Sequence, residues 1–125
     1  LEAPPVENLT GCYWKPEAFS LRRSEDGLFC EYVMDPASVI VARALEAGPA
    51  DSILDMCAAP GGKSLILAEE MWRGGQLGEN ARLVVNEMSE SRRERLLHVL
   101  QNYIPKEKIF TDLNIQHKPP CDCFL

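Results

Sequence analysis

The sequence predicts an α/β protein in which a parallel sheet is flanked by helices. Short apolar runs of β-character alternate with longer segments of helical periodicity, and a turn of small residues, Ala58–Gly62, joins one such run to a helix. Alternation of this kind favours parallel strands joined by right-handed crossovers. A chain of 125 residues with 46% hydrophobic content is long enough for one domain with a buried core.

Residues 1–34, rich in proline and glycine, are predicted to be a lead-in or linker, within which Leu28–Met34 is compatible with a short strand. The regular elements expected after it are a helix over 37–47, a strand over 52–57, a helix over 63–72, a strand over 82–87, a helix over 89–103 and a strand over 108–112.

The helical segments carry start and stop signals. Pro36 suits the first turn of the helix over 37–47, which places Val39, Ala42 and Leu45 near one face. In the helix over 89–103, Ser91 and Glu94 have the spacing of a capping box. The buried stripe of that helix is predicted to consist of Leu96, Leu97, Val99, Leu100 and Tyr103.

Composition narrows the cellular setting and the partners. No apolar run approaches the length of a membrane span, so no membrane partner is expected. Five scattered cysteines suit a reducing compartment, which predicts an intracellular protein, cytoplasmic or, in a eukaryote, organellar or nucleolar. A net charge of -6 argues against strong nucleic-acid binding by this chain alone, and its local basic clusters are expected to be solvated faces.

The segment Asp55–Ser64, DMCAAPGGKS, has the composition of a ligand-binding loop. Ligands of open parallel sheets bind beyond the carboxyl ends of the strands, where small residues let a ligand approach the backbone and helix amides face its polar groups. This placement predicts a Rossmann-like cofactor site. The candidate cofactor-binding residues of the loop are Cys57, Ala58, Ala59, Pro60, Gly61, Gly62 and Lys63.

A phosphate-binding loop is the weaker alternative for the same segment. Gly62, Lys63 and Ser64 match the end of the GxxxxGK[ST] pattern, which would make the protein an NTPase. The first glycine of that pattern falls on Cys57, so one of its two defining glycines is missing.

Two acids are placed at predicted strand ends. Glu87 ends the second strand, where a carboxylate can accept hydrogen bonds from the ribose hydroxyls of an adenosine-containing cofactor. Asp112 ends the third predicted strand, where its side chain could reach an adenine amino group, and an ordinary surface acid is an equally good interpretation there.

At DMCAAPGGKS the sequence resembles the first cofactor motif of the RNA 5-methylcytosine methyltransferases of the Sun/Nop2 family. The preceding MDPAS, Met34–Ser38, is similar to the family's stretch before that motif, and VNEMSESRRERL, Val85–Leu96, resembles its second motif. Together these segments cover about half of the chain, and CAAPGGK is the specific one.

The resemblance implies a Rossmann-like methyltransferase that moves a methyl group from S-adenosylmethionine to carbon 5 of cytosine in rRNA or tRNA. Residues 57–63 would hold the methionine end of the cofactor, Glu87 the ribose and Asp112 the adenine side. The implied domain is residues 35–125, containing only the N-terminal half of the sheet. A non-catalytic cofactor-binding or RNA-associated module is the alternative.

The catalytic residue is expected outside this chain. In the family a cysteine thiolate adds to carbon 6 of the base. The family's catalytic cysteines follow later strands, one in a Pro-Cys motif preceded by an acid. Cys121 follows Pro120 but lacks the preceding apolar strand and acid. Cys121 and Cys123 also have no partners at zinc-ligand spacing, so no metal site is predicted.

Overall fold

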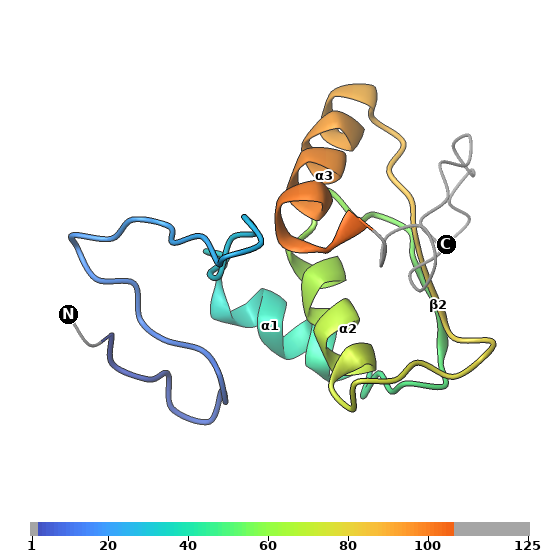
Figure 1. Ribbon diagram of the computed structural model, residues 1–125, viewed down its shortest axis with the longest axis horizontal. Helices are drawn as coiled ribbons and strands as arrows, with labels where there is room; N and C mark the ends of the chain where they lie inside the picture. Colours follow the sequence, from blue (N-terminus) through green and yellow to red (C-terminus); the bar gives the residue numbers. More distant parts are fainter. Residues whose placement is uncertain (1–2, 107–125) are drawn as a thin grey trace.

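The computed structural model describes residues 3–106 of the chain (Figure 1). The predicted strand over 108–112, with Asp112, and the cysteines Cys121 and Cys123 lie outside these residues. Within them the regular elements, in chain order, are α1 (Pro36–Arg43), β1 (Ser52–Asp55), α2 (Gly62–Trp72), β2 (Arg82–Val85) and α3 (Glu90–Tyr103).

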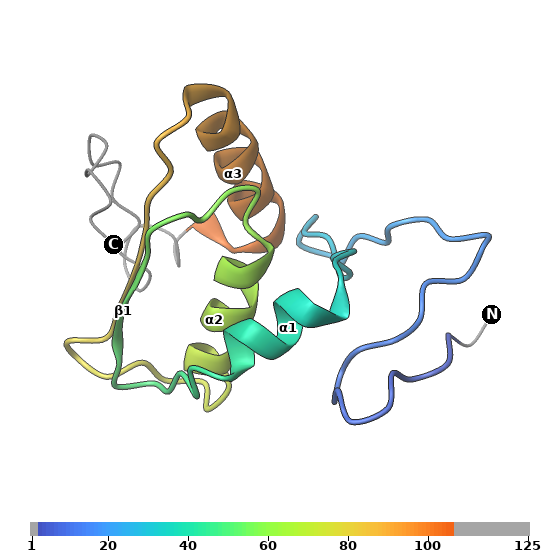
Figure 2. The ribbon, with the colours of Figure 1, turned by 180° about the vertical axis from the view of Figure 1, so that it is seen from behind.

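The two strands are parallel, with Ile53 opposite Leu83 and Leu54 opposite Val84. The predicted α/β class with parallel strands is therefore confirmed for the described residues. Figures 1 and 2 show α1, α2 and α3 on the same side of the two strands. Leu83 faces these helices and is buried, whereas Leu54, on the opposite face, is 57% exposed.

The core lies between β2 and the helices α2 and α3. Met71 of α2, Leu83 of β2 and Leu100 of α3 are its most deeply buried large side chains. In α2 the small and apolar residues Leu67, Ala68 and Met71 recur at the spacing of one helical face, and this face is the buried one. None of the helices within residues 3–106 is long and apolar enough to cross a membrane.

Helix α1 is shorter than the sequence indicates. Pro36 stands in its first turn as predicted, and Asp35 caps it by accepting a hydrogen bond from the Ser38 amide at 2.9 Å. The helix ends at Arg43, because the chain turns into the left-handed region at Glu46, where φ is +52°. The prediction that Leu45 shares a helical face with Val39 and Ala42 is therefore wrong, since Leu45 lies beyond the helix and is 58% exposed.

The expected strand over Leu28–Met34 does not form. Within that segment only Phe29 makes a β-bridge, to Arg23. The segment packs on α3 instead, because the Tyr103 hydroxyl donates to the Glu31 carbonyl at 2.7 Å and the Tyr103 ring lies 5.5 Å from Phe29 and 5.3 Å from Tyr32. Aromatic packing thus takes the place of strand pairing.

The start of α3 also differs from the sequence expectation. The helix begins at Glu90 with Ser89 as its N-cap, so Ser91 already lies in the first turn and the expected capping box with Glu94 is wrong. The carboxylate that accepts a hydrogen bond from the Ser89 amide, at 3.1 Å, belongs to Glu87. Leu96 and Leu100 of the predicted stripe are fully buried, whereas Leu97, Val99 and Tyr103 are half-buried.

Burial predicts very different costs for truncating two methionines. We expect Met71→Ala to lower the free energy of unfolding by about 2–5 kcal/mol, because it leaves a cavity in the core. The matched control is Met88→Ala, whose side chain is 69% exposed, and it should cost less than about 0.5 kcal/mol. Urea denaturation followed by circular dichroism measures both values, and equal losses would contradict this description of the core.

Candidate functional site

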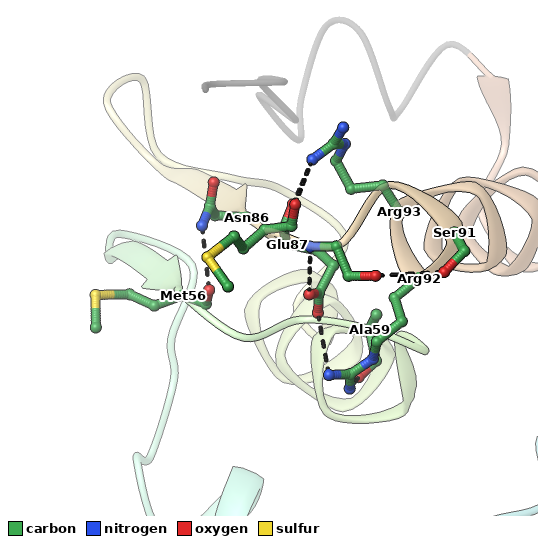
Figure 3. Close-up of polar contacts among 9 residues, drawn as sticks. Met56, Ala59, Asn86, Glu87, Ser91, Arg92 and Arg93 are labelled. Carbon is green, nitrogen blue, oxygen red and sulfur yellow. Dashed lines mark hydrogen bonds and ion pairs between the residues drawn. The ribbon is translucent and has the colours of Figure 1, made fainter. Parts of the chain in front are cut away.

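The loop that leaves β1 begins alongside the end of β2. The Asn86 amide donates to the Asp55 carbonyl at 2.8 Å, and the Ala58 amide donates to the Asn86 carbonyl at 2.9 Å. The side-chain amide of Asn86 adds a hydrogen bond to the Met56 carbonyl at 3.2 Å (Figure 3). The ladder between the strands thus extends into the loop, which brings the first loop residues and Glu87 to the same end of the sheet.

The seven candidate residues of the loop divide by exposure. Ala58, Ala59, Gly61 and Gly62 are buried, whereas Cys57, Pro60 and Lys63 are exposed. The loop therefore presents its outer residues to solvent while the small residues pack inward. Asp112, one of the two acids predicted at strand ends, lies outside the described residues.

Gly61 is required by its contact with α3. Its φ of +124° is rarely adopted by residues with a side chain. A Cβ at this position would lie 3.0 Å from Cγ1 of Val99 and 3.2 Å from Cδ1 of Leu96. The space that a side chain would need at Gly61 is therefore occupied by residues of α3.

Gly62 is packed in the same way against the segment before α1. A Cβ on Gly62 would lie 2.9 Å from Cε1 of Tyr32 and 3.2 Å from Cε of Met34. Met34 begins the MDPAS stretch, so the two motifs that the sequence analysis singled out separately are in contact. A packing role for these glycines cannot be recognised from local sequence, because Tyr32 and Val99 are distant from the loop along the chain.

The two ends of the loop are joined by a partly buried hydrogen bond. The Ser64 hydroxyl in the first turn of α2 donates to Oδ2 of Asp55, at the end of β1, at 2.6 Å. Ser64 is completely buried and Asp55 is half-buried, so this contact is partly shielded from water. Asp55 and Ser64 therefore hold the loop closed at its base.

Glu87 provides a buried oxygen that accepts no hydrogen bond from residues 3–106. Its residue is only 6% exposed, and Oε1 accepts the hydrogen bond from the Ser89 amide. Oε2 is buried without a hydrogen-bond partner and lies 3.9 Å from Nη1 of Arg92, a distance that suits an ion pair and not a hydrogen bond. A buried acceptor of this kind is costly unless a ligand or water satisfies it.

Two arginines of α3 reach back over the same region. Arg92 donates from Nη2 to the Ala59 carbonyl at 2.9 Å, and Arg93 donates from Nη1 to the carbonyls of Glu87 at 3.1 Å and Met88 at 2.8 Å (Figure 3). The sequence interpretation treated the basic cluster as a solvated face and so missed both contacts. The available signal was their position in the first turn of α3, because helical side chains lean toward the helix N-terminus.

Lys63 lies close to the cap of α1. The pKa of Asp35 is lowered mainly by hydrogen bonds from the Ser38 hydroxyl and amide, with a smaller contribution from the positive charge of Lys63. The exposed end of the loop and the MDPAS stretch are thus linked electrostatically as well as by packing.

The arrangement suits a polar organic ligand with hydroxyl groups. Its described components are a free carboxylate oxygen, a loop of small residues and the first turn of α2. Within residues 3–106, no group of three or more His, Cys, Asp or Glu side chains could hold a metal ion.

Comparison with known proteins finds several RNA methyltransferases. NSUN4 of Bos taurus, a 5-cytosine rRNA methyltransferase, is 43% identical over 81 residues, which make up 65% of this chain and 19% of the relative. The mitochondrial tRNA (cytosine(34)-C(5))-methyltransferase of Mus musculus is 32% identical over 101 residues, or 78% of this chain and 27% of that protein. A probable ribosomal RNA small subunit methyltransferase B of Bacillus subtilis is 47% identical over 45 residues, 36% of this chain and 10% of the relative.

The similarity concerns a part of these relatives. This chain spans about a fifth of the length of the NSUN4 proteins it matches, 19% in Bos taurus and 18% in Xenopus laevis. No protein-family profile matches the chain.

The packing of Gly61 predicts a larger loss of stability than its backbone conformation alone would cause. Gly75 also has a positive φ, +78°, but a Cβ there would meet nothing within 4 Å. We expect Gly75→Ala to cost about 1–2 kcal/mol and Gly61→Ala to cost at least about 1 kcal/mol more, because its Cβ would crowd Val99. Urea denaturation compares the two variants, and equal losses would refute the contact with α3.

The cap of α1 predicts a pH-dependent contribution to stability. Because the pKa of Asp35 in the folded chain lies below its ordinary value of 3.8, the ionised carboxylate stabilises the fold above about pH 4, and this contribution is lost as the pH falls through the lowered pKa. Asp35→Ala should therefore lower the melting temperature at pH 7 and have less effect at pH 3. Asp35→Asn keeps a capping oxygen without the charge, and its effect should not vary between these pH values in the same way.

Proposed function

Because this chain is related to a segment of the RNA 5-methylcytosine methyltransferases of the Sun/Nop2 family, we propose that it forms the cofactor-binding part of an enzyme that methylates carbon 5 of cytosine in rRNA or tRNA. The methyl donor in this proposal is S-adenosylmethionine, bound at the carboxyl ends of the strands of a Rossmann-like domain. The observation that carries the proposal is the buried Oε2 of Glu87 beside the loop, which accepts no hydrogen bond within residues 3–106.

The residues at the site fit an adenosyl cofactor. Glu87 lies two residues after the end of β2, and its Oε2 can accept a hydrogen bond from a ribose hydroxyl, which is the role of an acid near this position in dinucleotide-binding sheets. Residues 57–63 would hold the methionine end, and the first turn of α2 supplies backbone amides to polar groups of the ligand. Asp112 is proposed for the adenine side on the sequence pattern alone.

The chemistry divides between the cofactor and the protein. S-adenosylmethionine, when bound, supplies an electrophilic methyl group. Carbon 5 of cytosine is a poor nucleophile, so the reaction requires a cysteine thiolate that adds to carbon 6 of the base. We do not assign that role to Cys57, because this residue belongs to the loop that holds the cofactor in our proposal. The described residues would bind and orient the methyl donor.

An RNA substrate follows from the relatives' names, which specify rRNA in NSUN4 and tRNA in the mitochondrial enzymes. Two relatives are named as mitochondrial. The sequence predicts an intracellular protein. The names of these relatives support testing an organelle, as well as the cytoplasm, as the location of this protein.

The proposal and its alternatives differ in the ligand that binds. S-adenosylhomocysteine, the demethylated product, should bind the full chain, whereas ATP with magnesium would bind instead if the loop served an NTPase. Glu87 favours the adenosyl cofactor, because a phosphate loop has no matching use for a buried carboxylate. A non-catalytic module would bind S-adenosylhomocysteine but would form no covalent adduct with 5-fluorocytosine RNA in the natural full-length protein.

We expect Glu87→Ala to abolish measurable binding of S-adenosylhomocysteine in isothermal titration calorimetry. The loss of charge-assisted hydrogen bonds to ribose, each contributing about 1.5–3 kcal/mol, explains the size of the effect. Glu90→Ala removes an exposed acid from the first turn of α3 and should leave the affinity within about twofold. Absence of binding by the unmodified chain at millimolar ligand would refute the proposed function.

A further inference from the structure

We propose that Arg92 is a positioning residue that fixes the position of the cofactor loop relative to the carboxylate of Glu87. The inference rests on the proposed function, because it concerns the same site. It adds a role for a residue that belongs to neither the loop nor the strand end and that the sequence interpretation placed on a solvated face.

One guanidinium approaches both halves of the site. Nη2 of Arg92 donates a hydrogen bond to the carbonyl of Ala59, in the middle of the loop, at 2.9 Å. Nη1 of the same side chain lies 3.9 Å from Oε2 of Glu87. Figure 3 shows the side chain of Arg92 extending from the first turn of α3 toward these two groups. The two contacts join a loop after β1 to a residue after β2.

Both contacted residues are buried, and among residues 3–106 Arg92 is the donor observed for the Ala59 carbonyl. Ala59 is 7% exposed and Glu87 is 6% exposed. Arg92 donates a hydrogen bond to the Ala59 carbonyl. The positive charge of Arg92 also lies next to Oε2 of Glu87, the carboxylate oxygen that does not accept the hydrogen bond from Ser89. Because the guanidinium stands at ion-pair distance from this oxygen, a ligand hydroxyl can still approach it.

The chemistry of the contact requires arginine. A guanidinium presents several donors in a rigid planar fork, so one side chain can address two acceptors in a fixed geometry. A lysine at this position would carry its charge and its three donors on a single nitrogen at the end of a flexible chain, without a rigid fork that sets two donors at fixed positions. The fixed geometry of the two-point contact is therefore specific to arginine.

The neighbouring arginines do not share this arrangement. Arg93 donates to the backbone carbonyls of Glu87 and Met88 and thus closes the turn before α3. Arg95 is an exposed residue of the same helix, and it makes neither the contact to Ala59 nor the contact to Glu87 in the described part of the chain. Arg95 is accordingly the matched control for charge and helix position.

The experiment measures the affinity of the full chain for S-adenosylhomocysteine by isothermal titration calorimetry. We expect Arg92→Ala to weaken binding by about tenfold, which corresponds to about 1.4 kcal/mol. Arg92→Lys should recover part of this loss and remain about threefold weaker than the unmodified chain. Arg95→Ala should stay within about twofold. Thermal unfolding of each variant without ligand shows whether the fold is retained, and Arg92→Lys carries the test if Arg92→Ala unfolds.

A double-mutant cycle separates positioning from a general structural effect. Glu87→Gln retains an acceptor oxygen, so its weakened binding should remain measurable. If Arg92 acts through Glu87, replacing Arg92 with alanine in the Glu87→Gln background should weaken binding by less than about threefold, because coupled residues are not additive. A fully multiplicative loss would overturn the inference.

The remaining outcomes distinguish the two proposals. If the unmodified chain binds and Glu87→Gln binds weakly, but Arg92→Ala binds within twofold of the unmodified chain, the positioning role is overturned and the proposed function stands. If Arg95→Ala weakens binding as much as Arg92→Ala does, a general charge effect replaces the positioning role. Absence of binding by the unmodified chain overturns the proposed function and this inference together.

Discussion

The loop between β1 and α2 packs directly against α3 at Gly61, where a Cβ would lie 3.0 Å from Cγ1 of Val99. Packed interiors do not yield easily to an added methyl group, so this contact determines how near the loop lies to the helix. The position of α3 then determines where the side chains of its first turn lie relative to the loop. The arginines that contact the loop and the Glu87 turn therefore depend on the approach at Gly61.

The two residues that follow β2 join the strand to the loop and also carry buried acceptors. Asn86 donates hydrogen bonds from its backbone and its side-chain amide to Asp55 and Met56 and accepts one from Ala58. Within residues 3–106, Oδ1 of Asn86 and Oε2 of Glu87 are both buried and accept no hydrogen bond. The backbone bonds of Asn86 fix the position of this segment, while the two side-chain oxygens are acceptors that a ligand or water would satisfy.

The segment before α1 belongs to the same packing unit as the loop. Tyr32 contacts both Gly62 and Tyr103, and the Phe29 amide donates to the Asn102 carbonyl at the end of α3 at 2.9 Å. The boundary between residues 34 and 35 stays a prediction. The contacts show, however, that residues from Phe29 onward help to fix the position of the loop. The last residues of the lead-in, from Phe29 to the start of α1, are therefore packed against the rest of the fold and do not act only as a linker.

The sequence by itself determined the order of α2, β2 and α3 and the position of the loop between β1 and α2, because apolar periodicity and small-residue turns are local signals. It also singled out Glu87, since a carboxylate at a strand end is visible in the pattern. Tertiary structure alone decided that the loop glycines face Val99 and Tyr32, that residues 28–34 pack as aromatics instead of pairing as a strand, and that Arg92 spans Ala59 and Glu87. The contacts of the glycines, of the aromatic residues and of Arg92 with Ala59 join residues distant along the chain, so no local pattern encodes them. Glu87 and Arg92 are close in sequence, but their approach depends on where α3 begins.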